Sequence, residues 1–164
     1  MKTAWLPPAA ALTIFVLLSA AHADDKAKGK DVDYDVHGGY FESNKSGLAG
    51  DSSYLAFAGP KAFDAVFGVA KVQGDKPRFL PKDAFDSKVV VAVIKRGKSI
   101  YDYKVEKVTN DDGVLNVQYT AAPQESGGTA TFATPLILSV DKGKYDSVAF
   151  IENGKKVGTV KFAE

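Results

Sequence analysis

The alternation of hydrophobic and polar residues in the second half of the chain predicts β-strands. Residues 89–94 (VVVAVI) form a continuous apolar, β-branched run, which is typical of a central strand covered on both faces. Residues 101–105 and 115–119 alternate instead, and the NDDG sequence at 110–113 between them predicts a hairpin turn. This succession of strands and tight turns predicts an antiparallel β-sandwich or a barrel-like sheet.

The end of the chain predicts one more hairpin. Asn-Gly at 153–154 is a strong signal for a two-residue turn. If Glu152 and Lys155 flank this turn, Phe150 lies opposite Val157, and the hairpin gains one continuous apolar face.

One segment follows a helical period. In residues 61–69 (KAFDAVFGV), Phe63, Val66 and Phe67 recur at the spacing of one helical face, and Gly68 is typical of a helix end. The sequence therefore predicts a mainly β fold with one short α-helix.

The first residues have the pattern of an export signal. Residues 1–23 begin with Lys2, continue with a short apolar run and end on Ala-His-Ala, the small-x-small form that signal peptidase requires. We expect cleavage near Ala23, a charged flexible leader at 24–31, and a single β-rich domain at 32–164. The mature protein is then secreted or periplasmic; the alternative is an uncleaved membrane anchor.

The amino-acid composition excludes several kinds of chemistry. The chain has no cysteine, which excludes disulfides and thiolate chemistry. Its only histidines are His22 and His37. With 21 basic and 20 acidic residues, no charge excess favours nucleic acid as a partner. We therefore expect a non-enzymatic protein with no cofactor and no stable membrane insertion.

One acidic series has the spacing of a calcium loop. Asp31, Asp33, Asp35 and Glu42 stand at positions 1, 3, 5 and 12 of such a loop. The sixth position needs glycine for its sharp turn and carries Val36. We therefore interpret the aspartates as the wet face of a short strand and predict no metal site.

His37 invites comparison with a catalytic triad. Asp35, Ser43 and Ser46 lie near it in sequence, but no Gly-x-Ser-x-Gly elbow accompanies them. We predict a polar surface histidine in a turn.

Two alternatives come from other functional classes. Glu106, Asp111, Asp112 and Glu125 provide carboxylates for a secreted hydrolase, although turn chemistry explains the two aspartates. Gly-Gly at 127–128 is similar to a loop of chagasin-like inhibitors, which present loops to a protease cleft. A secreted protease inhibitor is therefore an alternative function, and a hydrolase is another.

Aromatic residues are the candidate binding residues. Tyr40 and Phe41 follow a Gly-Gly turn, where they either contact a partner or pack inward. Tyr101, Tyr103 and Tyr119 are predicted to share one sheet face, and alternating aromatics favour the covered face.

From about residue 54 to residue 162, an ordered series of motifs spans the chain: FDAVF, Phe85-Asp86 before KVVVAVIKRGK, YDYKVEKV, a hairpin to LNVQYTAAP, and Thr134-Pro135 before LILSV. This series resembles the C-terminal domain of the PrcB-type protease-complex subunit family. The chain departs from that pattern after the VVVAV strand, where Ser99-Ile100-Tyr101 replaces a Gly-Gly-aromatic turn.

The resemblance implies a secreted β-rich module without chemistry of its own. Such a module binds or stabilises another extracytoplasmic protein, for which a protease is the candidate. The resemblance transfers no catalytic residue to this chain.

Overall fold

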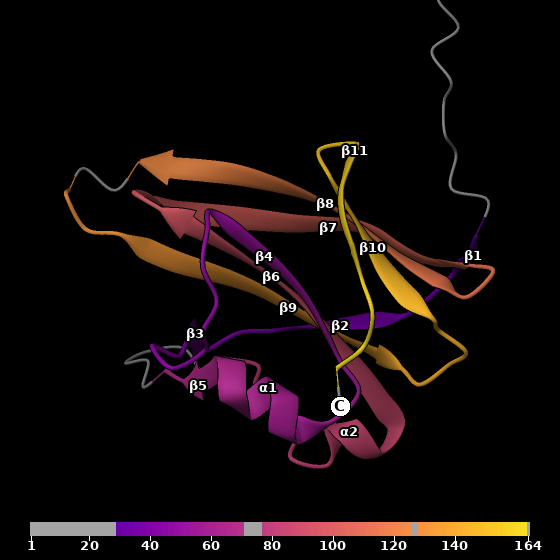
Figure 1. Ribbon diagram of the computed structural model, residues 1–164. Helices are drawn as coiled ribbons and strands as arrows, with labels where there is room; N and C mark the ends of the chain where they lie inside the picture. The colour runs from indigo at the N-terminus through magenta and orange to yellow at the C-terminus, as the bar shows by residue number, and fades with distance from the viewer. Residues whose placement is uncertain (1–28, 71–76, 126–127, 164) are drawn as a thin grey trace, which may run out of the picture.

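Three layers build the part of the chain that the structure describes. The computed structural model describes residues 29–70, 77–125 and 128–163, so the predicted signal sequence at 1–23 lies outside it. A five-stranded sheet packs on a four-stranded sheet, and two helices with a two-stranded ribbon lie beneath (Figure 1). The prediction of a mainly β, sandwich-like fold is confirmed.

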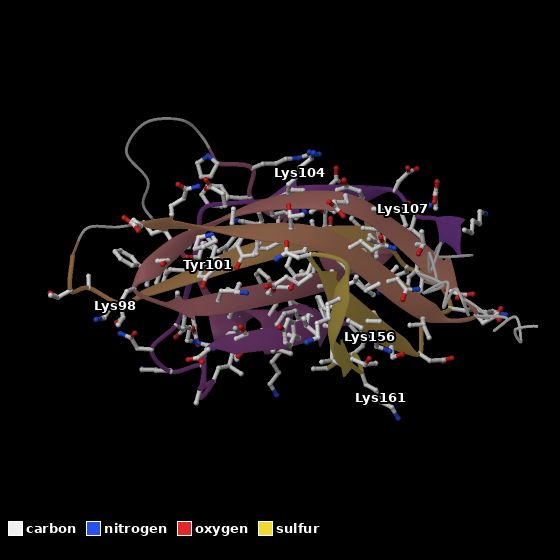
Figure 2. All side chains as sticks on the ribbon, turned by 90° about the horizontal axis from the view of Figure 1, so that it is seen from above. Lys98, Tyr101, Lys104, Lys107, Lys156 and Lys161 are labelled. Carbon is white, nitrogen blue, oxygen red and sulfur yellow. The ribbon has the colours of Figure 1, made fainter. Side chains whose placement is uncertain are left out.

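The upper layer, which we call the outer sheet, has one face exposed to solvent. Its strands are, in spatial order, β1 (Lys30–Asp31), β7 (Ser99–Asp111), β8 (Val114–Glu125), β10 (Ser147–Glu152) and β11 (Lys155–Val160). The predicted β7–β8 hairpin is present, and Asp112 and Gly113 take φ of 47° and 89° in its turn. Seen from above, Lys104 and Lys107 lie along one border of this sheet and Lys156 along the other (Figure 2).

The second layer, the central sheet, is buried on both faces. Its strands are, in spatial order, β2 (Tyr34–His37), β9 (Phe132–Asp141), β6 (Lys88–Gly97) and β4 (Ser52–Phe57). Alternate residues of β6, such as Val91, join the core beneath the outer sheet, whereas their neighbours, such as Ala92, join a second core on the helix side. The continuous apolar run at 89–94 therefore does mark a strand covered on both faces, as predicted.

The third layer corrects the helix prediction. Helix α1 (Pro60–Val66) ends three residues before the predicted limit, and the chain continues as β5 (Phe67–Val69). Strand β5 pairs with β3 (Tyr40–Glu42). A second helix of four residues, α2 (Ala84–Ser87), was not predicted. No helix within the described ranges has the length and apolar character needed to cross a membrane.

Two strand pairings differ from the expected ones, the first in direction and the second in register. Strand β10 pairs in parallel with β8. In the last hairpin, Glu152 lies opposite Lys155 as predicted, but a bulge then shifts Phe150 from Val157 to Gly158. The bulge places a glycine against the Tyr54 ring, where an added Cβ would stand 2.9 Å from the ring.

The beginning of the domain also differs from its prediction. The last two residues of the expected leader (24–31) form strand β1 against Thr109 and Asn110. Tyr34 and Val36, expected on a covered face, lie on edge strand β2 and stay 36% and 43% exposed. An edge strand has a neighbour on one side only, and these two side chains stay open to solvent.

Candidate functional site

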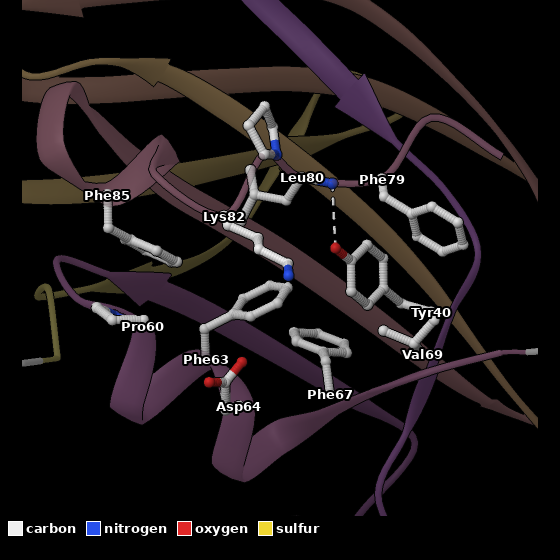
Figure 3. A pocket seen from close by; sticks show the side chains of 11 residues that line it. Tyr40, Pro60, Phe63, Asp64, Phe67, Val69, Phe79, Leu80, Lys82 and Phe85 are labelled. Carbon is white, nitrogen blue, oxygen red and sulfur yellow. Dashed lines mark hydrogen bonds between the residues drawn. The ribbon is translucent and has the colours of Figure 1, made fainter.

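A pocket opens on the helix side of the central sheet. Its volume is about 580 Å³. Aromatic rings, a proline-rich rim and two charged side chains surround it (Figure 3): it is lined by Tyr40, Pro60, Phe63, Asp64, Phe67, Val69, Phe79, Leu80, Pro81, Lys82 and Phe85. Because these residues come from α1, α2, β3, β5 and the segment before α2, the pocket exists only in the folded chain.

Phe63 links the pocket to the core below it. Its ring centroid lies 5.0 Å from that of Phe67, 5.5 Å from that of Phe57 and 5.9 Å from that of Phe85. Pro60 begins α1 at a position where a missing N–H costs nothing. The single helical turn that follows brings Phe63 onto the central sheet and fixes the rings of the pocket wall.

Tyr40 is the one predicted binding residue that lines this pocket. Its hydroxyl accepts a hydrogen bond of 3.0 Å from the backbone N–H of Leu80, which joins β3 to the segment before α2. Its ring packs edge-on against Phe63 at 5.4 Å and Phe79 at 5.8 Å. The ring therefore packs inward and also lines the cavity, and contact of Tyr40 with a partner stays a prediction.

Phe41 points to the opposite side of β3. It pairs with Gly68 of β5, and an added Cβ on that glycine would stand 2.5 Å from the Phe41 ring. Gly68 therefore allows the Phe41 ring to pack directly on its backbone, and it also lies close to the end of α1. Phe41 remains 48% exposed, so it stays a candidate contact residue outside the pocket.

The other three candidate tyrosines lie between the sheets. The Tyr101, Tyr103 and Tyr119 rings follow one another along the inner face of the outer sheet, with centroids 6.4 Å and 6.1 Å apart. Tyr119 is fully buried. The prediction that this face is the covered one is confirmed, and Tyr119 is corrected from a binding residue to a core residue.

A polar network anchors these tyrosines. The Tyr119 hydroxyl donates to Glu152 at 2.9 Å, and Glu152 is also paired with Lys95. The Lys95 ammonium lies 4.9 Å from the Tyr101 ring centroid. Burial, together with the Glu152 carboxylate, raises the pKa of Tyr103 and of Tyr119 well above the usual range. This network ties the two sheets together and leaves these hydroxyls protonated.

His37 is buried, contrary to the prediction of a surface histidine. It ends β2, is 6% exposed, and its Nε2 is hydrogen-bonded to Ser139 Oγ at 2.8 Å. Ser139 is itself completely buried, so this pair offers no nucleophile to a substrate. The serines considered from sequence lie elsewhere: Ser46 donates to Glu42, and Ser43 accepts from the backbone of Lys45.

We expect His37 to make the free energy of unfolding depend on pH. Burial lowers the pKa of His37, although the charge of Asp35 opposes the shift. Below the unfolded-state pKa of about 6.5, the His37 imidazole binds a proton in the unfolded chain but stays neutral in the folded chain until the pH is lower. Stability is therefore full above that pH and falls as the pH drops below it, by at most about 1.4 kcal/mol per pH unit.

Urea unfolding between about pH 7.5 and pH 5.5 measures this dependence. The matched variant is His37→Gln, which replaces the imidazole with a side-chain amide that can still form a hydrogen bond but cannot titrate. His22 is common to both proteins, so it cancels in the difference. Parallel curves for the two proteins would contradict the assignment.

Three of the four acidic residues considered as metal ligands, Asp31, Asp35 and Glu42, pair with cations instead. Asp35 contacts Arg78 at 2.6 Å and Lys88 at 3.4 Å. Burial works to raise the pKa of Asp35, but these two cations outweigh it and hold that pKa below its usual value. Within the described residues, no group of three or more His, Asp or Glu side chains is placed to hold a metal ion.

The hydrolase carboxylates do not form one site. Asp111 and Asp112 lie at the tip of the β7–β8 hairpin, whereas Glu125 lies opposite Ser99 at its other end. Glu106 is exposed on β7 between them. The inhibitor hypothesis depends on the Gly-Gly pair at 127–128, and Gly127 lies outside the described residues.

An ion pair that sequence reasoning missed shapes the loop beside the ribbon. Arg96 Nε and Nη2 donate to the two carboxylate oxygens of Glu42, each at 2.7 Å. Arg96 Nη1 also donates to the Gly50 carbonyl at 3.1 Å and to Ser53 Oγ at 3.0 Å. Burial alone would raise the pKa of Glu42, but the hydrogen bonds from Arg96 and Ser46 hold it below its usual value.

Comparison with known proteins gave no match: no protein-family model, no curated protein and no solved structure corresponds to this chain. The likeness to PrcB-type subunits therefore rests on the sequence motifs alone and stays a prediction.

Proposed function

We propose that this protein is a non-catalytic module, exported from the cytoplasm, that binds or stabilises another extracytoplasmic protein through the aromatic pocket. The observation that carries this proposal is the apolar rim of the pocket, where Val69 is 60% and Phe79 is 40% exposed. Large apolar side chains beside a hollow mark binding sites, because covering them releases water from apolar surface.

The lining of the pocket supports binding over catalysis. Its ionisable side chains are Asp64, Lys82 and Tyr40, and the Tyr40 hydroxyl already accepts a backbone hydrogen bond. A catalytic site needs a nucleophile or base with an orienting partner, and the rings that dominate this lining supply neither. They supply rigid contact area.

Export and partner class come from the sequence. The signal pattern at 1–23 supports a location outside the cytoplasm. The resemblance to PrcB-type subunits supports a protein partner, with a protease as the candidate.

Affinity capture with paired variants tests the proposal. The full chain with a C-terminal tag is expressed in its source organism as wild type, Val69→Lys and Ile100→Lys. Ile100 is the matched control, since it is 42% exposed on β7 and lies outside the pocket. We expect one protein to be retained by wild type and Ile100→Lys and to be reduced at least about tenfold with Val69→Lys, the effect of losing an interface anchor.

Two results would contradict the proposal. One is the same set of captured proteins with all three baits. The other is turnover of a substrate by the purified wild-type protein that Val69→Lys abolishes.

A further inference from the structure

We propose that the pocket receives a polypeptide segment in which a carboxylate lies beside two or more apolar side chains. This inference rests on the proposed function and specifies the chemistry of the partner. A chain end and an internal Asp or Glu both supply such a carboxylate.

The size of the pocket requires more than one apolar side chain. At about 580 Å³, it falls within the range of roughly 300–1,000 Å³ that holds whole drug-sized ligands. A single inserted side chain would leave much of this space to water, and the exposed Val69 and Phe79 side chains at the rim would stay hydrated. Two or more neighbouring apolar side chains fill it.

Lys82 supplies the charge that selects a carboxylate. Its side chain extends toward the Phe63 ring and into the circle of aromatic residues, and Asp64 projects from α1 at the periphery (Figure 3). None of the ion pairs among the described residues involves Lys82. Lys82 is exposed, so a carboxylate bound here forms an ion pair at the mouth of the pocket, where solvent partly screens the attraction.

Asp64 sets the orientation of the bound segment. Its carboxylate repels another carboxylate and therefore favours the Lys82 side of the pocket for the partner's negative charge. The apolar side chains then contact the exposed apolar lining residues Val69 and Phe79.

The rim favours a polypeptide over a small free acid. An acid confined to the cavity would leave the exposed surfaces of Val69 and Phe79 in water. A longer chain that enters the pocket continues across the rim and covers both residues.

Titration calorimetry with two pairs of acetylated peptides tests this chemistry. The first pair is Gly-Ser-Gly-Leu-Phe as the free acid and as the C-terminal amide. The second is Ser-Gly-Leu-Phe-Glu-Gly amide and the same peptide with Gln in place of Glu. The first pair reports a chain end and the second an internal carboxylate. The small free acid 3-phenylpropionate completes the set.

We expect one acidic peptide or both to bind about fivefold more tightly than the neutral match, the size of effect typical of a partly exposed ion pair. Lys82→Met retains the apolar stem and should abolish this preference, whereas Asp64→Asn should increase it. Lys61→Met is the matched control, since Lys61 is an exposed lysine of α1 outside the pocket lining, and it should preserve the preference.

The inference is overturned if neutral and acidic peptides bind equally, or if 3-phenylpropionate binds as tightly as the peptides. It is also overturned if no peptide binds at about millimolar concentration, some 4 kcal/mol of binding free energy, while Val69→Lys still abolishes partner capture. In that case the proposed function stands. A carboxylate preference that depends on Lys82, with capture unchanged by Val69→Lys, supports the pocket chemistry and contradicts the proposed function.

Discussion

Phe63→Ala should lower the free energy of unfolding by about 3–5 kcal/mol, the range for truncating a buried aromatic residue. Phe63 is 3% exposed and contacts the rings of Phe57, Phe67 and Phe85. Its removal leaves a cavity between α1 and the central sheet, because β4 and β6 are held by their own pairings and cannot collapse into the space. Chemical denaturation monitored by circular dichroism measures the change.

Phe79→Ala is the matched control for this prediction. Phe79 contacts Tyr40 at 5.8 Å but is 40% exposed, so its loss should cost less than about 1 kcal/mol. Equal losses for the two variants would contradict this prediction, because they would show that the pocket rim contributes as much as Phe63 to the stability of this layer. The expected contrast means that the wall of the pocket is built on the core, whereas its rim is open to a partner.

The sheets are the part of the fold that local patterns predict well. The run at 89–94 reports burial on both faces, because every residue of a doubly covered strand must be apolar. The Asn153-Gly154 and Asp112-Gly113 turns are encoded locally by residues that accept positive φ. Both features are predictable because they depend only on residues that are adjacent in the sequence.

The end of α1 depends on a distant strand. Phe67 continues the helical spacing of Phe63, yet it begins β5 because the segment Tyr40–Glu42 offers it a pairing partner. The parallel pairing of β10 with β8 is likewise set by the packing of the whole outer sheet. The helical pattern of a nine-residue segment carries no information about such distant pairing strands, so the tertiary pairing overrides the local pattern.

The candidate site was only partly predictable for the same reason. The position of Tyr40 after a Gly-Gly turn makes it a candidate binding residue, and the structure places it in the pocket wall. The sequence places Phe63 and Phe67 on a helix face, and Phe79, whose ring packs against Tyr40, lies beyond that segment along the chain. Only the folding of β3 against β5 brings these rings around one cavity.

Arg96→Met should lower the free energy of unfolding by about 2–4 kcal/mol, somewhat less than for a fully buried pair. The Arg96 and Glu42 side chains are 18% and 9% exposed. Methionine retains the apolar stem but leaves the Glu42 carboxylate with little solvent and without its two strongest hydrogen bonds. Thermal and denaturant unfolding both measure the loss.

The double variant Arg96→Met/Glu42→Met separates the contribution of the ion pair from the cost of leaving one buried charge unpaired. In the double variant neither charge remains. Its loss of unfolding free energy should therefore be smaller than the sum of the losses in the two single variants, by a coupling energy of about 1–3 kcal/mol. Additive losses would mean that Arg96 acts mainly through the Gly50 carbonyl and Ser53. Coupling instead makes the pair a clamp between β6 and β3, the strand that carries Tyr40 into the pocket. Because none of the three variants retains the clamp, peptide binding should then weaken in all of them.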